Sequence, residues 1–180
     1  MHLDRHHAIS ALGLAFCLLA ACRPAVNDGR RATAPLRNAS GEAVGTLTLR
    51  DVPGEPLRIE GDLTGLPAGT HGIHFHSVGQ CAAAGQFASA GPHFNPASRK
   101  HGLESTEGPH AGDLPNVVVG ADGRAVVRLT TERVTLGREA ASLLDADGSA
   151  VVVHAGPDDQ RTDPAGNSGD RIACGVIAPP

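Results

Sequence analysis

Short segments of alternating apolar and polar residues, separated by turn sequences, constrain the fold of this chain most. Turn pairs such as Pro53-Gly54, Asp122-Gly123 and Asp147-Gly148 stand between them, and Gly and Pro in such pairs favour tight reversals. No long stretch has a convincing helical period, so the pattern predicts an antiparallel β-sandwich or barrel. The predicted strands are a weaker one at Thr33–Arg37, then Thr46–Leu49, Leu57–Leu63, His71–His76, Asn116–Val119, Ala125–Leu129, Ala150–His154 and Ile172–Ile177, with room for a helical turn or two at Arg138–Leu144.

Composition limits the core and the partners. The chain has 180 residues, which fits one domain plus a short targeting segment. Aromatic residues make up only 2% of it, with no Trp or Tyr, so Val, Leu, Ile and Ala must form the core. The formal net charge is -4, which gives no indication of a nucleic-acid partner.

The N-terminus predicts export. Arg5 precedes an apolar run, Ala8 to Ala21, that is too short to span a bilayer. The run ends in Leu19-Ala20-Ala21-Cys22, which resembles a bacterial lipobox. We therefore expect a signal peptide over residues 1–21, a lipidated Cys22 with a flexible tether over 22–32, and the folded domain over 33–180. The alternative is an ordinary signal peptide followed by a chance Cys.

Four cysteines are thereby divided between leader and domain. Cys17 leaves with the signal peptide and Cys22 carries the lipid, which leaves Cys81 and Cys174. Two cysteines in the domain of an exported chain predict a disulfide. The alternative is a pair of buried free thiols.

Two segments interrupt the strand pattern. Ser77–Pro115 is long and shows no sustained alternation, and Ala155–Asp170 is rich in Asp, Gly and Pro. Long loops without regular structure in a compact domain are usually functional. Each begins directly after a strand that carries histidine, which indicates a site there.

The histidines predict a metal centre. His74 and His76 are two residues apart on a predicted strand, so both side chains leave the same face, and His154 ends another strand. The long loop carries the remaining candidates, which are His93, His101, His110 and Asp113. Three imidazoles with one carboxylate suit Zn²⁺, and an all-imidazole group suits Cu(II). Spacing alone leaves open whether there are one or two sites.

Six motifs resemble the copper/zinc superoxide dismutase family in order and spacing, and with the flanking strands they cover nearly all of the chain after the tether. They are Gly72-Ile73-His74-Phe75-His76, Ala90-Gly91-Pro92-His93-Phe94-Asn95-Pro96, Ser98-Arg99-Lys100-His101, His110-Ala111-Gly112-Asp113-Leu114, Val152-Val153-His154 and the segment Gly169 to Ile177. The resemblance implies an all-β, eight-stranded antiparallel Greek-key barrel or flattened sandwich with long metal-binding and electrostatic loops. It also implies one copper and one zinc per subunit, and it leaves monomer and homodimer open.

The resemblance assigns the ligands residue by residue. Copper is expected on His74, His76, His93 and His154, and zinc on His93, His101, His110 and Asp113. His93 is then an imidazolate that bridges the two metals.

Three further residues match family positions around the metals. Asp158 matches a carboxylate that links His74 to His101, with an ordinary loop acid as the alternative. His71 matches a buried structural histidine that is not a ligand. Arg171 matches the arginine beside the copper, with an ordinary surface arginine as the alternative.

The activity that the resemblance implies is dismutation of superoxide to dioxygen and hydrogen peroxide in the cell envelope, with the protein anchored to the membrane by lipid and facing the periplasm. Arg171 and His93 are the expected catalytic residues. Two departures from the family pattern predict weaker electrostatic steering, namely the short loop after His154 and the acidic Asp170 beside Arg171. The alternatives are an exported copper and zinc carrier of the same fold and a structural adhesive domain, and the latter leaves the histidines unexplained.

Overall fold

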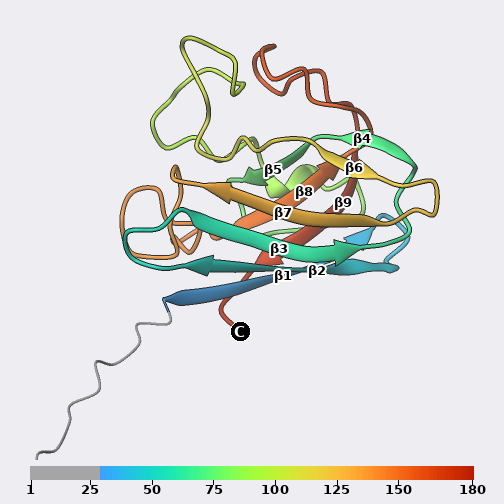
Figure 1. Ribbon diagram of the computed structural model, residues 1–180, viewed down its shortest axis with the longest axis horizontal. Helices are drawn as coiled ribbons and strands as arrows, with labels where there is room; N and C mark the ends of the chain where they lie inside the picture. The colour runs from blue at the N-terminus through green and yellow to red at the C-terminus, as the bar shows by residue number, and fades with distance from the viewer. Residues whose placement is uncertain (1–28) are drawn as a thin grey trace, which may run out of the picture.

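Nine β-strands make up the framework of residues 29–180, the part of the chain that this computed structural model describes (Figure 1). Seven of them form one curled antiparallel sheet in the order β5-β8-β9-β1-β2-β3-β7, while β4 pairs with β6, and β6 lies beside β7. The bounds are β1 Arg30–Asn38, β2 Ala43–Asp51, β3 Leu57–Leu63, β4 Gly69–His71, β5 Ile73–His76, β6 Val117–Val119, β7 Ala125–Thr131, β8 Ser149–His154 and β9 Arg171–Ile177.

The all-β prediction is confirmed, and the extra strand has a local cause. The predicted strand His71–His76 divides into β4 and β5 at Gly72. The Gly72 N–H donates to the carbonyl of Gly156, and its own carbonyl accepts from the His154 N–H, at 2.8 Å each. Because these bonds tie Gly72 to the segment after β8, the chain turns there from one sheet to the other.

Two local expectations differ from the structure. Strand β1 begins at Arg30, inside the segment predicted as tether, because Arg30 and Arg31 pair with Asp51 and Arg50 of β2. Arg138–Leu144 contains no helix. The only helical element among residues 29–180 is a short 3-10 turn at Ala88–Ala90.

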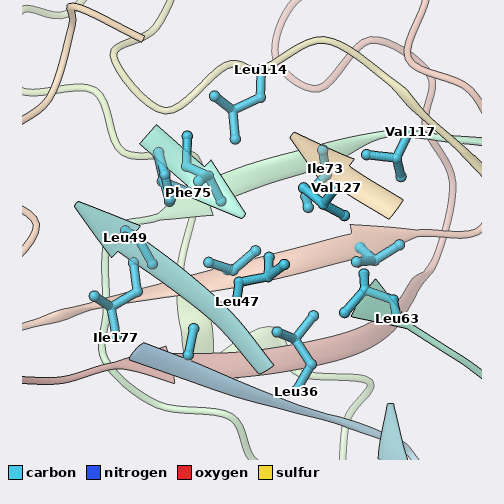
Figure 2. Close-up of a cluster of buried hydrophobic side chains, with 14 of the residues drawn as sticks. Leu36, Leu47, Leu49, Leu63, Ile73, Phe75, Leu114, Val117, Val127 and Ile177 are labelled. Carbon is cyan, nitrogen blue, oxygen red and sulfur yellow. The ribbon is translucent and has the colours of Figure 1, made fainter. Parts of the chain in front are cut away.

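The core is aliphatic, as the composition requires. Alternate residues of the strands point inward, so that Leu47 and Leu49 are buried on β2 while Thr48 between them is exposed. Burying such side chains is the main stabilising contribution to a fold of this kind. Figure 2 shows the cluster, with Leu36, Leu47, Leu49, Leu63, Ile73, Phe75, Leu114, Val117, Val127 and Ile177 labelled.

The long loop covers the outer side of β5 and β8. Ile73 and Phe75 point into the main core, whereas His74 and His76 alternate to the opposite face. Main-chain hydrogen bonds join Phe94 N to Phe75 O and Phe75 N to Gly112 O at 2.8 and 2.9 Å. The loop therefore runs back along the free edge of β5 and encloses the two histidines, which are fully buried.

The predicted signal peptide, Cys22 and most of the predicted tether lie outside the described residues. Within residues 29–180, no helix has the length and apolar character needed to cross a bilayer.

Candidate metal centre

Four buried imidazoles meet where β5, β8 and the long loop come together. They belong to His74, His76, His93 and His154, and one ring nitrogen from each lies within 4.8 Å of the others. His74 Nδ1 and the Nε2 atoms of the other three are buried and have no hydrogen-bond partner in the described protein. Unpaired buried polar atoms are costly. Four that converge on one point are what a cation-binding site requires.

Main-chain carbonyls fix which nitrogen is free. The other nitrogen of His76, Nδ1, faces the Gly91 carbonyl at 2.9 Å, and His154 Nδ1 faces the Gly169 carbonyl at 3.1 Å. A carbonyl can only accept, so in both rings Nδ1 carries the proton and Nε2 keeps its lone pair. The lone pairs point to the centre of the group.

A second group lies on the other side of His93. The Nδ1 atoms of His93, His101 and His110 lie 3.0, 3.0 and 3.3 Å from Asp113 Oδ1. The second carboxylate oxygen, Oδ2, accepts from the backbone N–H groups of Gly102 and His110 at 2.8 and 2.9 Å. Three nitrogens and one oxygen make the donor set of a closed zinc site.

His93 is shared by the two groups. Its Nδ1 faces the second group, and its unpartnered Nε2 faces the first. The register of the edge strand explains this position, because His93 forms a bridge with His76 on β5. A single imidazole can therefore contact both metals, the arrangement that the family resemblance implies.

Asp158 joins the two groups from behind. Its Oδ2 lies 2.7 Å from His74 Nε2, and its Oδ1 lies 3.0 Å from His101 Nε2. Asn116 exchanges two hydrogen bonds with the Asp158 backbone, at 2.8 and 2.9 Å, and the Gln160 N–H donates to Oδ1 at 2.6 Å. The carboxylate accepts hydrogen bonds from both imidazoles, so it orients these ligands and is not itself a third metal group.

Gly166 makes the Asp158 bridge possible. It has φ +63°, and a Cβ added there would collide with the Asp158 carboxylate and lie 2.7 Å from His101 Nε2. A side chain at this position would displace the bond between Asp158 and His101. The loop after β8 therefore needs a glycine at this point.

Burial keeps three imidazoles of the first group, those of His76, His93 and His154, neutral. It lowers the pKa of His93 to about 4 and that of His154 to about 3, although hydrogen bonds to Asp113 and Gly169 act in the opposite direction. Burial also lowers the pKa of His76 well below its usual value. Neutral imidazole is the form that binds metal, so these ligands are ready at neutral pH.

The second group holds a buried negative charge. Burial acts to raise the pKa of Asp113, but hydrogen bonds from His101, His110 and His93 outweigh it and bring that pKa far below its usual range. Burial likewise acts to lower the pKa of His101, yet its bonds to Asp113 and Asp158 raise it to about 9. A metal that binds here must therefore displace a proton from His101.

His71 stands apart from both groups. Its Nδ1 lies 2.7 Å from the His154 carbonyl and its Nε2 lies 2.9 Å from the Pro67 carbonyl. Both nitrogens are thus engaged with main-chain oxygens, and neither is available to a metal. The contact supports the end of β8, where His154 must point inward.

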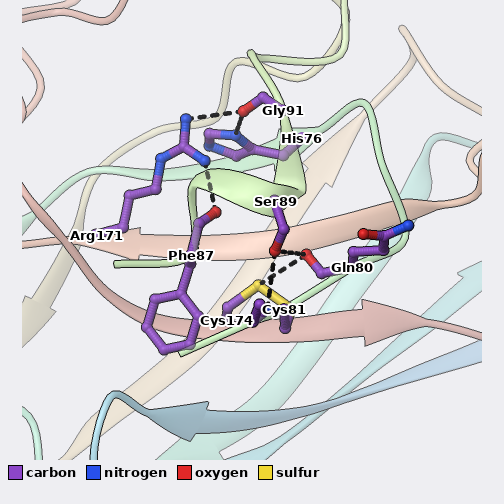
Figure 3. Close-up of a disulfide and its surroundings, with 9 residues drawn as sticks. His76, Gln80, Cys81, Phe87, Ser89, Gly91, Arg171 and Cys174 are labelled. Atoms are coloured by element: carbon purple, nitrogen blue, oxygen red, sulfur yellow. Dashed lines mark hydrogen bonds between the residues drawn. A yellow bond between two sulfur atoms is a disulfide. The ribbon is translucent and has the colours of Figure 1, made fainter. Parts of the chain in front are cut away.

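Arg171 lies beside the first group and is held by two carbonyls (Figure 3). Its Nη1 and Nη2 donate to the carbonyls of Phe87 and Gly91, each at 2.8 Å. The Gly91 carbonyl also accepts from His76 Nδ1 at 2.9 Å. Arg171 and the candidate copper ligand His76 therefore donate to the same carbonyl oxygen. Arg171 pairs with His154 across β8 and β9.

The predicted disulfide joins Cys81 to Cys174, whose Cα atoms are 5.6 Å apart. Both cysteines pack against Phe87, which is buried and has φ +59°. Figure 3 shows the bridge below the segment that carries the Phe87 carbonyl. The disulfide, Phe87 and Arg171 therefore form one connected structure.

Sequence reasoning missed the residues that support the site. They are Phe87 and Gly91, which hold Arg171, together with Asn116 and Gln160, which fix Asp158, and Arg133, which contacts Asp113. Most of these contacts use main-chain atoms, which any residue type can supply. Residue type matters only at Gly91, with φ +75°, and at Asn116 and Arg133, which make their contacts through side-chain atoms.

The curled sheet carries two adjoining donor groups that share one histidine. One group is all imidazole, and the other has three imidazoles and one carboxylate. Such an arrangement defines a dinuclear metalloprotein of the redox class. Residues 43–177 match the family model described as copper/zinc superoxide dismutase (SODC). The chain belongs to the copper/zinc superoxide dismutase family.

Curated relatives agree with this assignment. The chain is 44% identical over 149 residues to superoxide dismutase [Cu-Zn] 2 of Aquifex aeolicus, covering 82% of this chain and 86% of that protein. It is also 44% identical over 152 residues to the superoxide dismutase [Cu-Zn] of Caulobacter vibrioides, covering 81% and 84%. The metals of the family are copper and zinc, and the two groups of donors described above fit them.

A solved structure gives the same fold. The crystal structure of a SOD-like protein from Bacillus subtilis superposes with a TM-score of 0.77 at 39% identity, covering 81% of this chain and 97% of that one. That protein is described only as SOD-like, so a similar fold does not by itself identify the metal sites. The donor atoms of this chain identify them.

Proposed function

We propose that this protein dismutates superoxide, with copper bound by the first group and zinc by the second. The observation that carries this proposal is the convergence of four unpartnered imidazole nitrogens beside a guanidinium held by two carbonyls. Bound copper supplies the one-electron exchange with superoxide, while zinc, which has no redox chemistry, holds the loop and His93.

The copper ligands follow from which imidazole nitrogens are free, and the zinc ligands from which imidazole nitrogens lie around Asp113 Oδ1. Copper is assigned to Nδ1 of His74 and to Nε2 of His76, His93 and His154. Zinc is assigned to the Nδ1 atoms of His93, His101 and His110 and to Asp113 Oδ1. Asp158 and His71 orient these ligands from outside.

His93 and Arg171 perform the remaining steps. Two superoxide anions and two protons yield one dioxygen and one hydrogen peroxide; we assign delivery of one proton to His93 and of the other to solvent. His93 Nε2 is buried and has no protein partner, so whenever it is not bound to copper it can hold the proton assigned to it and pass it to peroxide. Arg171 attracts the anion and orients it, because its charge lies next to the first group while the chain as a whole is negative.

A non-catalytic carrier of the same fold is the rival. A carrier needs exchangeable metal but no fixed cation beside it. The two carbonyls that hold the Arg171 guanidinium restrict it to one position, and burial lowers its pKa. Placing a desolvated cation there is energetically unfavourable. A reaction with an anion explains why the cation is there, whereas metal transport does not. An enzyme is therefore the better explanation.

Arg171→Ile tests the enzyme against the carrier. We expect the second-order rate constant with superoxide to fall roughly tenfold or more, with copper and zinc content unchanged. The wild-type rate should fall as salt is added, because screening shortens the reach of the field, and the variant should lose most of that dependence.

Two matched variants complete the Arg171 experiment. Arg128→Ile removes an exposed arginine on the outer side of β7 and should leave rate and salt slope close to wild type. Asp170→Asn, which removes an opposing charge beside Arg171, should raise the rate modestly. Wild-type turnover and an unchanged salt slope in Arg171→Ile would reject steering by this residue.

We further propose that the protein is exported, that residues 1–21 are removed and that lipid on Cys22 holds the protein at the membrane. Residues from 22 to the start of β1 serve as a tether. The remainder forms the catalytic domain on the periplasmic side. The disulfide between Cys81 and Cys174 supports export. The lipid anchor is supported by the sequence Leu19-Ala20-Ala21-Cys22.

Cys22→Ser should release the protein from membranes without changing its chemistry. A fully modified lipobox cysteine carries several acyl chains, and more than one chain is needed for firm anchoring. The measurement is the distribution of activity between membrane and soluble fractions of the cell envelope. A variant that still sediments wholly with membranes would show that Cys22 is not the anchor.

A further inference from the structure

Arg133 lies behind the zinc group, on the segment that follows β7. Its Nη2 donates a 2.5 Å hydrogen bond to the main-chain carbonyl of Asp113. Its Nε is buried and has no partner in the described protein. A buried donor without an acceptor lowers stability. The unpaired Nε lowers the stability of the folded protein, so another contact of Arg133 must compensate for it. That contact is the hydrogen bond to Asp113.

The bond from Arg133 reaches a part of Asp113 that the metal-site contacts leave free. Asp113 Oδ1 faces three imidazoles, and Oδ2 accepts two backbone N–H groups. The main chain of Asp113 bridges to His74 at the edge of β5. Asp113 is thus held between β5 on one side and the guanidinium on the other.

The segment that carries Arg133 is itself anchored to the sheet. The backbone N–H of Arg133 donates to Thr131 Oγ1 at 3.2 Å. Asp51, at the end of β2, accepts from Thr135 Oγ1 at 2.6 Å and from the Leu136 N–H at 2.7 Å. Hydrogen bonds therefore connect β2 through this segment to the main chain of Asp113.

Charge and position predict opposite effects of Arg133 on zinc. As a cation near the site, it would repel a bound dication. As a donor to the Asp113 carbonyl, it fixes the carboxylate against the three imidazoles. The bond goes to the carbonyl and leaves both carboxylate oxygens to the site, so it orients Asp113 without competing for its charge.

We propose that Arg133 is a positioning residue that sets the zinc affinity of the protein by holding the main chain of Asp113. The proposal rests on the zinc ligands assigned above. Loss of an outer partner of a metal ligand typically weakens metal binding by about 10- to 100-fold. The effect should be confined to the second group, because the carbonyl of Asp113 is the acceptor.

The test measures zinc affinity of the full-length chain by competition with a chromogenic chelator. Arg133→Met should weaken zinc binding by about 10- to 100-fold and leave copper affinity unchanged. Arg133→Lys, which keeps the charge but has one donor nitrogen on a shorter side chain, should fall between Arg133→Met and wild type. Arg128→Met, on the exposed side of β7, should bind zinc as wild type does.

Unchanged or tighter zinc binding in Arg133→Met would overturn the proposal, and so would a lower melting temperature of the metal-free protein with zinc affinity unaltered. If the methionine variant does not fold, the lysine variant alone decides between weaker and unchanged binding. His110→Ala distinguishes an error in the zinc-ligand assignment from an error in the role of Arg133. If it too leaves zinc affinity unchanged, the ligand assignment is wrong; if it abolishes binding while Arg133 variants do not matter, only the role of Arg133 is wrong.

Discussion

Replacing His154 by Ala is expected to abolish superoxide turnover and to leave zinc bound. His154 Nε2 is one of the four free nitrogens of the first group, and no atom of the second group comes from His154. Loss of a ligand must weaken copper binding by at least the roughly 10- to 100-fold that loss of an outer partner produces. Metal analysis per chain and a superoxide assay on the same sample measure both effects.

His110→Ala is the matched variant for the second group. It should lose zinc, disorder the long loop and lower the melting temperature, while copper still binds, because metal supplies order that this loop otherwise lacks. His110 contributes to the zinc group alone. Equal loss of both metals in both variants would mean that the two sites are not separable.

Removal of the disulfide should produce the largest loss of stability. Cys81 and Cys174 are 93 residues apart in sequence, and closing a loop of that length stabilises the folded state by roughly 4 to 5 kcal/mol in the chain-entropy description, which is an upper guide. Denaturant unfolding of the Cys81→Ala/Cys174→Ala variant against wild type, both loaded with metal, measures the difference.

Activity should fall together with stability in that variant. Both cysteines pack against Phe87, whose carbonyl holds Arg171, so a looser segment around Phe87 frees the guanidinium. The rate should therefore drop and lose part of its salt dependence even where the variant is fully folded. Recovery of two free thiols from protein isolated from the cell envelope would contradict the pairing itself.

Side-chain patterns predicted the all-β framework, whereas the individual metal ligands were assigned through the family resemblance. Alternation along β2 and β3 marks the core face, because a strand with one buried side repeats every two residues. His74 and His76 share a face for the same reason. The histidines of the loop needed the family motifs, since spacing alone does not bring His101 next to Asp113.

The supporting contacts could not be predicted in the same way. The break at Gly72 depends on main-chain bonds to a segment more than 80 residues away, and the carbonyls of Phe87 and Gly91 act on Arg171 through atoms common to every residue. Arg133 had no motif at all. Its role emerges only when the segment after β7 is seen to lie against Asp113.

The most direct test of the central claim is metal content per chain measured together with superoxide-dependent turnover on one preparation. We predict one copper and one zinc per chain, with a rate constant that scales with copper occupancy and falls as ionic strength rises. A protein that binds both metals fully and still shows no superoxide turnover above the rate in buffer alone would contradict the claim and identify the chain as a carrier.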